Sequence, residues 1–356
     1  MKKNLIGLLP EELADLITSI GQPKFRATQL WQYIYAKGYK DFDAMTSLGK
    51  ECIALLKKDY SIARPEVKVH QVSSDGTQKV LLDMGAGHTV ETVFIPLETR
   101  GTVCISSQVG CNMGCTFCNT GTQKMVRNLT AYEITSQVML IKDILGDWQN
   151  PTKKLVSNLV FMGMGEPLHN YSQVKNAILI LKSQSGLAFS KRRITVSTCG
   201  IVPMINKMSK ELDVSLALSL HAPNDELRSS IMPINHKYSI KELIECCKNY
   251  YQGSTPRRIT IEYIMLLNVN DEIEHAHELA ELLRGFPVKI NLIPFNPWGD
   301  IPLERSSNNR VHKFMHELCQ LGYSVSIRVT RGDDISAACG QLKTESKRVS
   351  KRITKQ

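Results

Sequence analysis

The sequence has no long apolar run, and this absence excludes a simple membrane-spanning protein. No uninterrupted apolar stretch among the 356 residues approaches the roughly 20 residues of a transmembrane helix. The apolar start at residues 5–9 resembles a signal peptide only weakly, because the segment Pro-Glu-Glu at residues 10–12 ends it too early. We therefore expect a cytoplasmic protein that does not contact a membrane.

The ten cysteines do not show the regular spacing of a disulfide framework, because they are scattered through helical and strand patterns. In a reducing compartment such a set indicates metal binding, catalysis or plain packing. Free cysteine is among the most buried residue types, so packing is the default for most of them. The ten are Cys52, Cys104, Cys111, Cys115, Cys118, Cys199, Cys246, Cys247, Cys319 and Cys339.

Three of these cysteines form one compact motif with the spacing C-x3-C-x2-C, at Cys111, Cys115 and Cys118. Three thiolates can bind three irons of a 4Fe-4S cluster and leave the fourth iron open for a substrate. Gly114 lets the backbone turn tightly around a bulky group. The alternatives are a disulfide or structural zinc, but structural zinc needs four ligands, usually in two pairs, and no second pair is present.

The charge balance is basic, with 44 Lys and Arg against 34 Asp and Glu and a formal net charge of +10. Such a surface favours binding of a polyanion such as RNA, although a merely basic soluble protein has the same composition. Residues 343–356 carry six Lys and Arg and one acid. We expect this tail to be disordered and suited to an RNA backbone, or simply to aid solubility.

The apolar pattern predicts three segments before the tail. Residues 1–65 show three amphipathic helices, and residues 66–96 show short strands separated by turn residues. Residues 97–342 alternate between strand and helix six times, which predicts parallel strands with right-handed crossovers. The predicted fold class is α/β, a partial (β/α)6 barrel with a helical accessory domain and a β-extension. Its strands are at residues 102–106, 159–162, 194–197, 214–219, 259–264 and 290–293.

Glycine and polar residues follow the carboxyl ends of several of these strands, where the ligands of such a sheet bind. A glycine allows close backbone approach to a ligand, a carboxylate can accept from an amino group, and the others fit ribose and carboxylate contacts. Ordinary turns and satisfied half-buried polar residues explain each of them equally well when taken singly. The candidates are Gly165, Glu166, Ser197, Ser219, Leu220, His221 and Asn296.

Three further residues have side chains suited to catalysis. Cys339 precedes Gly340 in an accessible context, and Cys104 lies near the end of the first barrel strand, so the two thiols can meet at one mouth of the barrel. For Cys104 alone, a core thiol is the better interpretation. Glu91 lies among apolar neighbours in a β-pattern, where a partly buried carboxylate can serve as a general base or can simply face solvent.

Taken together, these motifs resemble the RlmN family of dual-specificity RNA methyltransferases, which are radical S-adenosylmethionine (radical SAM) enzymes. The resemblance runs from the N-terminal helices to about Leu342. It is specific because five separated motifs fall in the right order. Besides the cluster loop, they lie at residues 104–111, 163–167, 219–224 and 332–342.

The resemblance implies a role for each candidate. Cys111, Cys115 and Cys118 hold the 4Fe-4S cluster, and the seven strand-end candidates line SAM. Two SAM molecules serve each turnover: one methylates the Cys339 sulfur, and the other is cleaved to a 5′-deoxyadenosyl radical that takes hydrogen from that methyl group. The carbon radical then adds to C2 of an adenine, an electron-poor carbon that polar methyl transfer cannot use.

The implied release step uses Glu91 and Cys104. Glu91 acts as the general base for the C2 proton, and Cys104 resolves the adduct through a transient disulfide with Cys339. The implied substrates are 23S rRNA, in its peptidyl-transferase region, and tRNA, at the adenine 3′ of the anticodon.

The implied partner is an external electron donor such as flavodoxin and its reductase, and we expect a monomer. Two rival interpretations stay open at this point. One is a Cfr-type enzyme that methylates C8 of the rRNA adenine. The other is a non-catalytic RNA-binding protein with a structural metal.

Overall fold

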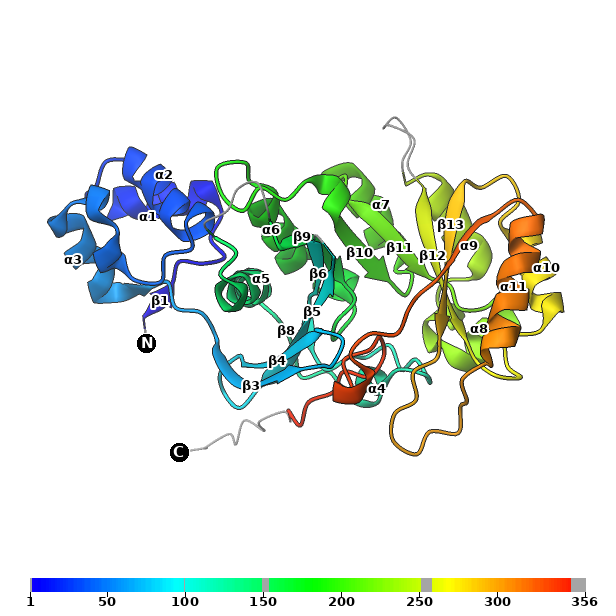
Figure 1. Cartoon of the computed structure of the whole chain (residues 1–356). Coiled ribbons are helices and arrows are strands. Elements are labelled where there is room, and N and C mark those ends of the chain that lie inside the picture. Colours follow the sequence, from blue (N-terminus) through cyan, green and yellow to red (C-terminus); the bar gives the residue numbers. More distant parts are fainter. Residues whose placement is uncertain (1, 99, 149–153, 251–257, 347–356) are drawn as a thin grey trace, which may run out of the picture.

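The structure, a computed structural model, describes residues 2–98, 100–148, 154–250 and 258–346. Figure 1 shows a helical N-terminal module at one end of the molecule and a long mixed sheet that occupies the rest. Helices cover the outer side of the sheet, and the segment that follows the last strand returns across it to α4 (Asn119–Thr122) (Figure 1). Within the described ranges, no helix has the length and apolar character needed to cross a bilayer.

The sheet has ten strands in the order β14-β13-β12-β11-β10-β9-β6-β5-β4-β3, and it is open because β14 and β3 are its two edges. Seven neighbouring strands, from β14 to β6, are parallel. Their carboxyl ends therefore meet at one edge of the half-barrel. They are β6 (Arg100–Cys104), β9 (Val156–Phe161), β10 (Ile194–Thr198), β11 (Ser215–Ser219), β12 (Ile259–Met265), β13 (Val288–Pro294) and β14 (Ser324–Ile327).

All six predicted barrel strands are present and each is followed by a helix, so the partial (β/α)6 barrel is confirmed, and one further strand extends its sheet. The additional strand, β14, pairs in parallel with β13. Its sequence, Ser-Val-Ser-Ile, is short and half polar, and none of its four residues is fully buried. The pattern expected of an interior parallel strand is a continuous apolar run, which an edge strand does not need.

The predicted β-extension continues the same sheet. Three antiparallel strands, β3 (Glu66–Val72), β4 (Gln78–Asp83) and β5 (Thr89–Leu97), join the barrel through β5, which pairs with β6. In this pairing Val93 lies opposite Cys104. The extension therefore covers the edge of β6, the strand that leads into the cluster loop.

The N-terminal module contains the predicted helices and a small parallel pair of strands, β1 (Lys3–Asn4) and β2 (Tyr60–Ser61). It contacts helix α5 (Ala131–Leu145) through an ion pair of 3.2 Å between Arg64 and Asp143 and a hydrogen bond from the Tyr132 hydroxyl to the Ala63 carbonyl. The module contains α1 (Pro10–Ser19), α2 (Phe25–Trp31), the π-helix η1 (Gln32–Ala36), η2 (Phe42–Ala44), η3 (Thr46–Leu48) and α3 (Lys50–Asp59).

The barrel helices begin at clear sequence signals. A capping box formed by Thr130 and Glu133 opens α5, and Ser239 and Glu242 form a second one at α9. The remaining helices are η4 (Pro167–Asn170), α6 (Tyr171–Lys182), η5 (Lys191–Arg193), α7 (Val202–Glu211), α8 (Asp225–Ile231), η6 (Pro233–His236), α9 (Ile240–Lys248), α10 (Ile273–Leu282), α11 (Asn308–Gln320) and η7 (Asp333–Ile335).

The start of the basic tail is ordered against β5. Thr344 and Ser346 are buried, and their hydroxyls donate to the Thr89 carbonyl at 3.1 and 3.3 Å. The prediction of disorder from residue 343 onward is therefore wrong for its first four residues. The remaining residues of that prediction, 347–356, lie outside the described residues.

Candidate functional site

The three motif cysteines line one cavity of about 130 Å³ at the carboxyl ends of the barrel strands. The loop that carries them lies between two short antiparallel strands, β7 (Gln108–Val109) and β8 (Arg127–Asn128). The predicted tight turn is present, since Gly114 has φ +67°. The Cys118 amide donates to the Cys115 carbonyl at 3.2 Å, so the loop folds back on itself within the motif.

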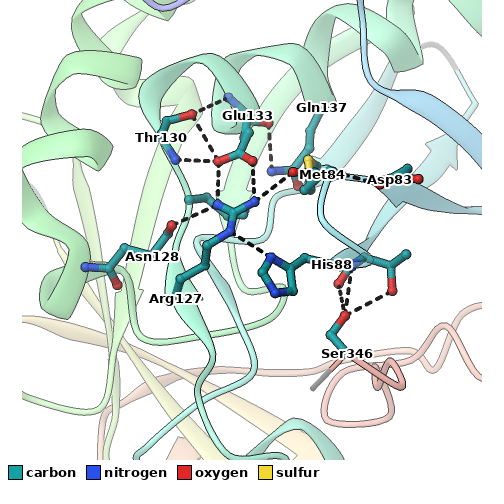
Figure 2. A network of polar contacts seen from close by, with 12 residues as sticks. Asp83, Met84, His88, Arg127, Asn128, Thr130, Glu133, Gln137 and Ser346 are labelled. Atoms are coloured by element: carbon teal, nitrogen blue, oxygen red, sulfur yellow. Dashed lines mark hydrogen bonds and ion pairs between the residues drawn. The ribbon is translucent and has the colours of Figure 1, made fainter. Parts of the chain in front are cut away.

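Arg127 fixes the base of this loop to two other segments, as Figure 2 shows. Its guanidinium donates to both Glu133 carboxylate oxygens, at 2.9 and 2.6 Å, and to the Met84 carbonyl at 2.8 Å. Its Nε donates to His88 Nδ1 at 3.1 Å. The first turn of α5 and the β4–β5 turn thus hold the loop at a fixed place beside the sheet.

Five of the seven residues predicted to line SAM surround the same cavity: Gly165, Glu166, Ser197, Ser219 and His221. Gly165 has φ +94°, and a Cβ there would lie 2.4 Å from the Gln108 Cβ. Only glycine therefore fits this position without a shift of its neighbour. Backbone, hydroxyl, imidazole and carboxylate groups converge on the cavity next to the three thiols.

The Glu166 carboxylate has fewer open acceptor positions than the sequence suggests. Its buried carboxylate already accepts hydrogen bonds from the Leu168 amide, the Thr198 hydroxyl and the Cys199 amide, at 2.9, 2.8 and 2.8 Å. Burial raises the pKa of Glu166 above its ordinary value, and these hydrogen bonds oppose the rise. A carboxylate has about four lone-pair sites, so one acceptor position stays available for a ligand.

His221 is neutral and oriented by its neighbours. Burial lowers its pKa to about 3. Its Nδ1 accepts from the Ile264 amide at 3.0 Å, which places the ring proton on Nε2. The Phe117 ring contacts the imidazole edge-on at 4.9 Å between centroids.

The other two predicted SAM residues do not line this cavity. Leu220 is fully buried, and its carbonyl accepts from Arg228 Nε at 3.0 Å. Asn296 lines a second cavity instead, where its Nδ2 donates to the Cys339 carbonyl at 3.3 Å. Asn296 therefore contacts the segment of the candidate methyl-carrying cysteine.

Cys339 lines both cavities, although it is 221 positions after Cys118 in the sequence. Helix α4, which follows Cys118 directly, holds it there. The Asn119 amide donates to the Gly340 carbonyl at 2.7 Å, and the Thr120 hydroxyl donates to the Leu342 carbonyl. The cluster loop and the candidate thiol are thus fastened to each other.

Cys104 lines the second cavity, of about 280 Å³, together with Cys339. Burial raises the pKa of Cys104 to about 12. The predicted meeting of the two thiols is therefore supported at the level of a shared cavity. Apolar side chains of β5, Val93 and Ile95, line the same space.

Glu91 is buried and does not face solvent, which were the two alternatives, and it lines neither of these two cavities. Its carboxylate forms an ion pair of 3.0 Å with Lys79 and accepts from the Lys343 amide at 2.9 Å. Lys343 lies four residues after Cys339, so the carboxylate is held near the segment of the candidate methyl-carrying cysteine. Its role as general base stays a prediction.

Comparison with known proteins identifies the family. Residues 105–280 match the radical SAM superfamily, and residues 3–62 match the ribosomal RNA large subunit methyltransferase N-terminal domain. The dual-specificity RNA methyltransferase RlmN of Agrobacterium fabrum is 51% identical over 369 residues, covering 98% of this chain and 90% of that protein. The chain belongs to the RlmN family.

Two further comparisons agree with this. The RlmN of Dinoroseobacter shibae is 48% identical over 360 residues, covering 98% of this chain and 91% of that protein. The crystal structure of a radical SAM methyltransferase from Sphaerobacter thermophilus has a TM-score of 0.90 at 42% identity, covering 96% of this chain and 99% of the other. This RlmN family chain is a SAM-dependent methyltransferase of the radical SAM type, and its cofactors are a 4Fe-4S cluster and SAM.

The cysteines of this RlmN family chain fit the cluster. Burial raises the pKa of Cys118 to about 11 and that of Cys111 well above its ordinary value, so iron binding must displace their protons. In the part of the chain that the structure describes, no three His, Cys, Asp or Glu side chains converge closely enough for a single metal ion. In a 4Fe-4S cluster each cysteine thiolate binds a different iron, so these three cysteines would hold three of the four irons.

Sequence reasoning missed two charged groups in the site. Arg328 follows β14, lines both cavities and lies within electrostatic range of Cys339, Cys104 and Glu262. Glu262 lies on β12 and lines the cluster cavity, and it accepts from Asn291 Nδ2 at 2.7 Å. The signal for Glu262 was available, because it is the one charged residue in the strand Ile-Thr-Ile-Glu-Tyr-Ile-Met.

A fourth cysteine was interpreted only as packing. Cys199 follows β10, lines the cluster cavity, and lies with its Sγ 4.0 Å from the Cys115 Sγ. The hydrogen bond to Cys115 and burial hold the pKa of Cys199 well above its ordinary value. Its position after Ser197 and Thr198 at a strand end was the signal that could have found it.

Proposed function

We propose that this protein methylates C2 of an adenine in the peptidyl-transferase region of 23S rRNA and C2 of the adenine 3′ of the anticodon in tRNA. The methyl carbon travels on Cys339. The observation that carries the proposal is that Cys339 lies in the wall shared by two cavities, with the three cluster cysteines on one side and Cys104 on the other. The names of the relatives, dual-specificity RNA methyltransferases, support RNA as the substrate.

The cluster cavity prepares the methyl group. When bound there, the 4Fe-4S cluster and SAM supply the methyl group and the one-electron chemistry. Cys111, Cys115 and Cys118 hold the cluster, while Gly165, Glu166, Ser197, Ser219 and His221 bind and orient SAM. The Cys339 sulfur accepts the methyl group as a thiolate, and the positive charge of Arg328 lowers the pKa of Cys339 against the effect of burial.

The second cavity receives the adenine. Its apolar lining from Val93 and Ile95 suits the faces of a base, and Cys104 and Cys339 both border it. A base can reach such a cavity only when it leaves its stack, which non-helical RNA permits at low cost. C2 of adenine is electron-poor and not nucleophilic, so the carbon on Cys339 must reach it by a radical route.

Release of the product requires two further residues. Glu91 removes the C2 proton of the covalent adduct. Cys104, as a thiolate, then attacks the Cys339 sulfur, so that a sulfur–sulfur bond forms and the sulfur–carbon bond breaks. The released carbon takes up a proton and becomes the methyl group, and the unpaired electron of the adduct leaves to the one-electron carrier that serves the cluster. The disulfide carries the oxidation, and an external donor such as flavodoxin with its reductase returns both thiols and supplies the cluster electron.

The remaining segments hold the RNA. We assign residues 1–65 to an accessory domain that contacts RNA, residues 66–96 to an extension that supplies Glu91, and residues 97–342 to the catalytic barrel. The basic residues after 342 add electrostatic attraction to the RNA backbone. The protein works as a cytoplasmic monomer.

Product analysis tests this function. Purified rRNA and tRNA from cells lacking the gene are treated with reconstituted enzyme, digested to nucleosides and separated by mass spectrometry. The proposal expects 2-methyladenosine in both RNAs. Formation of 8-methyladenosine would instead establish a Cfr-type reaction, and a protein that takes up zinc but no iron and sulfide would refute the enzymatic function.

A further inference from the structure

Cys199 lies close to the cluster loop and is held rigidly. Its Sγ is 4.0 Å from the Cys115 Sγ, which is a hydrogen-bonding distance for sulfur and is too long for a disulfide bond. Its amide donates to Glu166 at 2.8 Å, and its carbonyl accepts from Arg228 Nη2 at 2.7 Å. Two buried charged groups therefore fix the backbone of Cys199 and with it the position of the thiol.

We propose that the Cys199 thiol donates a hydrogen bond to the Cys115 thiolate of the bound cluster and thereby raises the cluster's reduction potential. Of the two sulfurs, only Cys199 can be the donor in the loaded protein, because a cysteine bound to iron carries no proton. This inference rests on the cluster binding in the proposed function and goes beyond it by assigning a residue that tunes the cluster.

The expected direction of the shift in reduction potential follows from the charge of the cluster. Reduction adds an electron to the cluster and increases the negative charge on its thiolate ligands. A donor aimed at one of these sulfurs stabilises the reduced state more than the oxidised state. Removal of the donor should make the cluster harder to reduce and should slow the step in which the external donor passes an electron to it.

The alternative is that Cys199 binds the fourth iron directly. Cys199 follows a strand end outside the C-x3-C-x2-C loop, and its sulfur lies 4.0 Å from the Cys115 sulfur, which would itself bind another iron. A thiolate on the fourth iron would also occupy the position that SAM needs. The geometry therefore favours a donor to Cys115 over a fourth ligand.

The test compares Cys199→Ala and Cys199→Ser with the unmodified protein after anaerobic reconstitution. Cys52→Ala is the matched control, because it removes a buried thiol from α3 in the N-terminal module. Iron and sulfide content are measured first, and the midpoint potential is then obtained by a redox titration followed by electron paramagnetic resonance. We expect full clusters in all four proteins.

In the alanine variant, the ratio of reduced to oxidised cluster at a fixed potential should be about tenfold lower. This corresponds to a fall of about 59 mV in the midpoint potential of a one-electron couple. The serine variant keeps a hydrogen-bond donor, so its midpoint potential should lie between those of the alanine variant and the unmodified protein. The midpoint potential of Cys52→Ala should match that of the unmodified protein. An unchanged potential in Cys199→Ala with an intact cluster overturns the inference and leaves the proposed function standing. A resonance spectrum that responds to added SAM only after Cys199 is removed would show a fourth ligand and overturns it too. Failure of the unmodified protein to take up iron and sulfide overturns both.

Discussion

Replacement of Arg328 tests whether a buried positive charge keeps the methyl-accepting thiol reactive. Burial raises the pKa of Cys339 above its ordinary value, and the guanidinium of Arg328 opposes this rise, while Glu262 reinforces it. Arg328→Met removes the charge at nearly constant length, and Arg328→Lys retains a charge in another position. The methionine variant should therefore raise the pKa of Cys339 and lower the fraction of thiolate at neutral pH.

The size of the effect follows from the charge and from thiol chemistry. An opposite charge within about 4–6 Å shifts a pKa by roughly 1–3 units. Each unit lowers the thiolate fraction about tenfold at a pH below the pKa. A more basic thiolate is also a better nucleophile, with a Brønsted slope of about 0.4–0.5. Its intrinsic reactivity therefore rises about threefold for each unit of pKa, which partly offsets the tenfold loss of thiolate. Alkylation of Cys339 should therefore slow by about three- to fourfold for each unit of pKa.

The assay is alkylation by iodoacetamide between about pH 6 and 9, read by mass spectrometry of the peptide that contains Cys339. The protein is used without cluster, after its intact mass has shown that Cys339 carries no methyl group. Arg331→Met is the matched control, because Arg331 lines the same second cavity but lies 3.9 Å from the carboxylate of Asp75. Coincident pH profiles for Arg328→Met and the unmodified protein would refute the assigned role of Arg328, and so would an equal shift in Arg331→Met.

Four further outcomes are expected. Cys104→Ala should trap RNA covalently on the protein, visible as a slow band in a denaturing gel, and Cys339→Ala should show no such band. Turnover of Cys104→Ala at the normal rate would remove its resolving role. Arg127→Met leaves the buried Glu133 carboxylate of α5 without its ion-pair partner and should lower the free energy of unfolding in urea by about 2–4 kcal/mol. This is at the low end for a buried ion pair because the Arg127 side chain is 30% exposed. Gly165→Ala should weaken SAM binding in equilibrium dialysis, since its Cβ meets a side chain at 2.4 Å. Glu262→Gln should accelerate alkylation of Cys339, opposite to Arg328→Met, because it removes a negative charge that raises the pKa of that thiol.

The interior of the fold could be predicted from the sequence because its strands are short segments rich in apolar and β-branched residues. Strand β10 is Ile-Thr-Val-Ser-Thr and β12 is Ile-Thr-Ile-Glu-Tyr-Ile-Met, and each precedes a helical pattern or a turn. The same reasoning does not reach β14, whose four residues need no apolar face at the sheet edge. The order of the first four tail residues was missed for a related reason, since Thr344 and Ser346 are held by hydrogen bonds that have no apolar signature.

The site could be predicted where its chemistry is local. The cluster loop is identified by spacing alone, and the strand-end residues follow from the rule that ligands bind at carboxyl ends. The partnership of Cys104 with Cys339 came from chain order and resemblance. The structure supports this partnership because both thiols line the second cavity.

The missed groups share one physical cause, which is that their roles arise from packing between distant strands. Arg328 was overlooked because the strand it follows, β14, was itself overlooked, so an error about an edge strand became an error about the charge in the site. Glu262 and Cys199 lie on or after predicted strands, but their significance depends on which thiol each one faces. A charged residue inside an apolar parallel strand, or a thiol directly after one, therefore merits functional interpretation even when no motif contains it, because burial of such groups is costly unless a partner or ligand stabilises them.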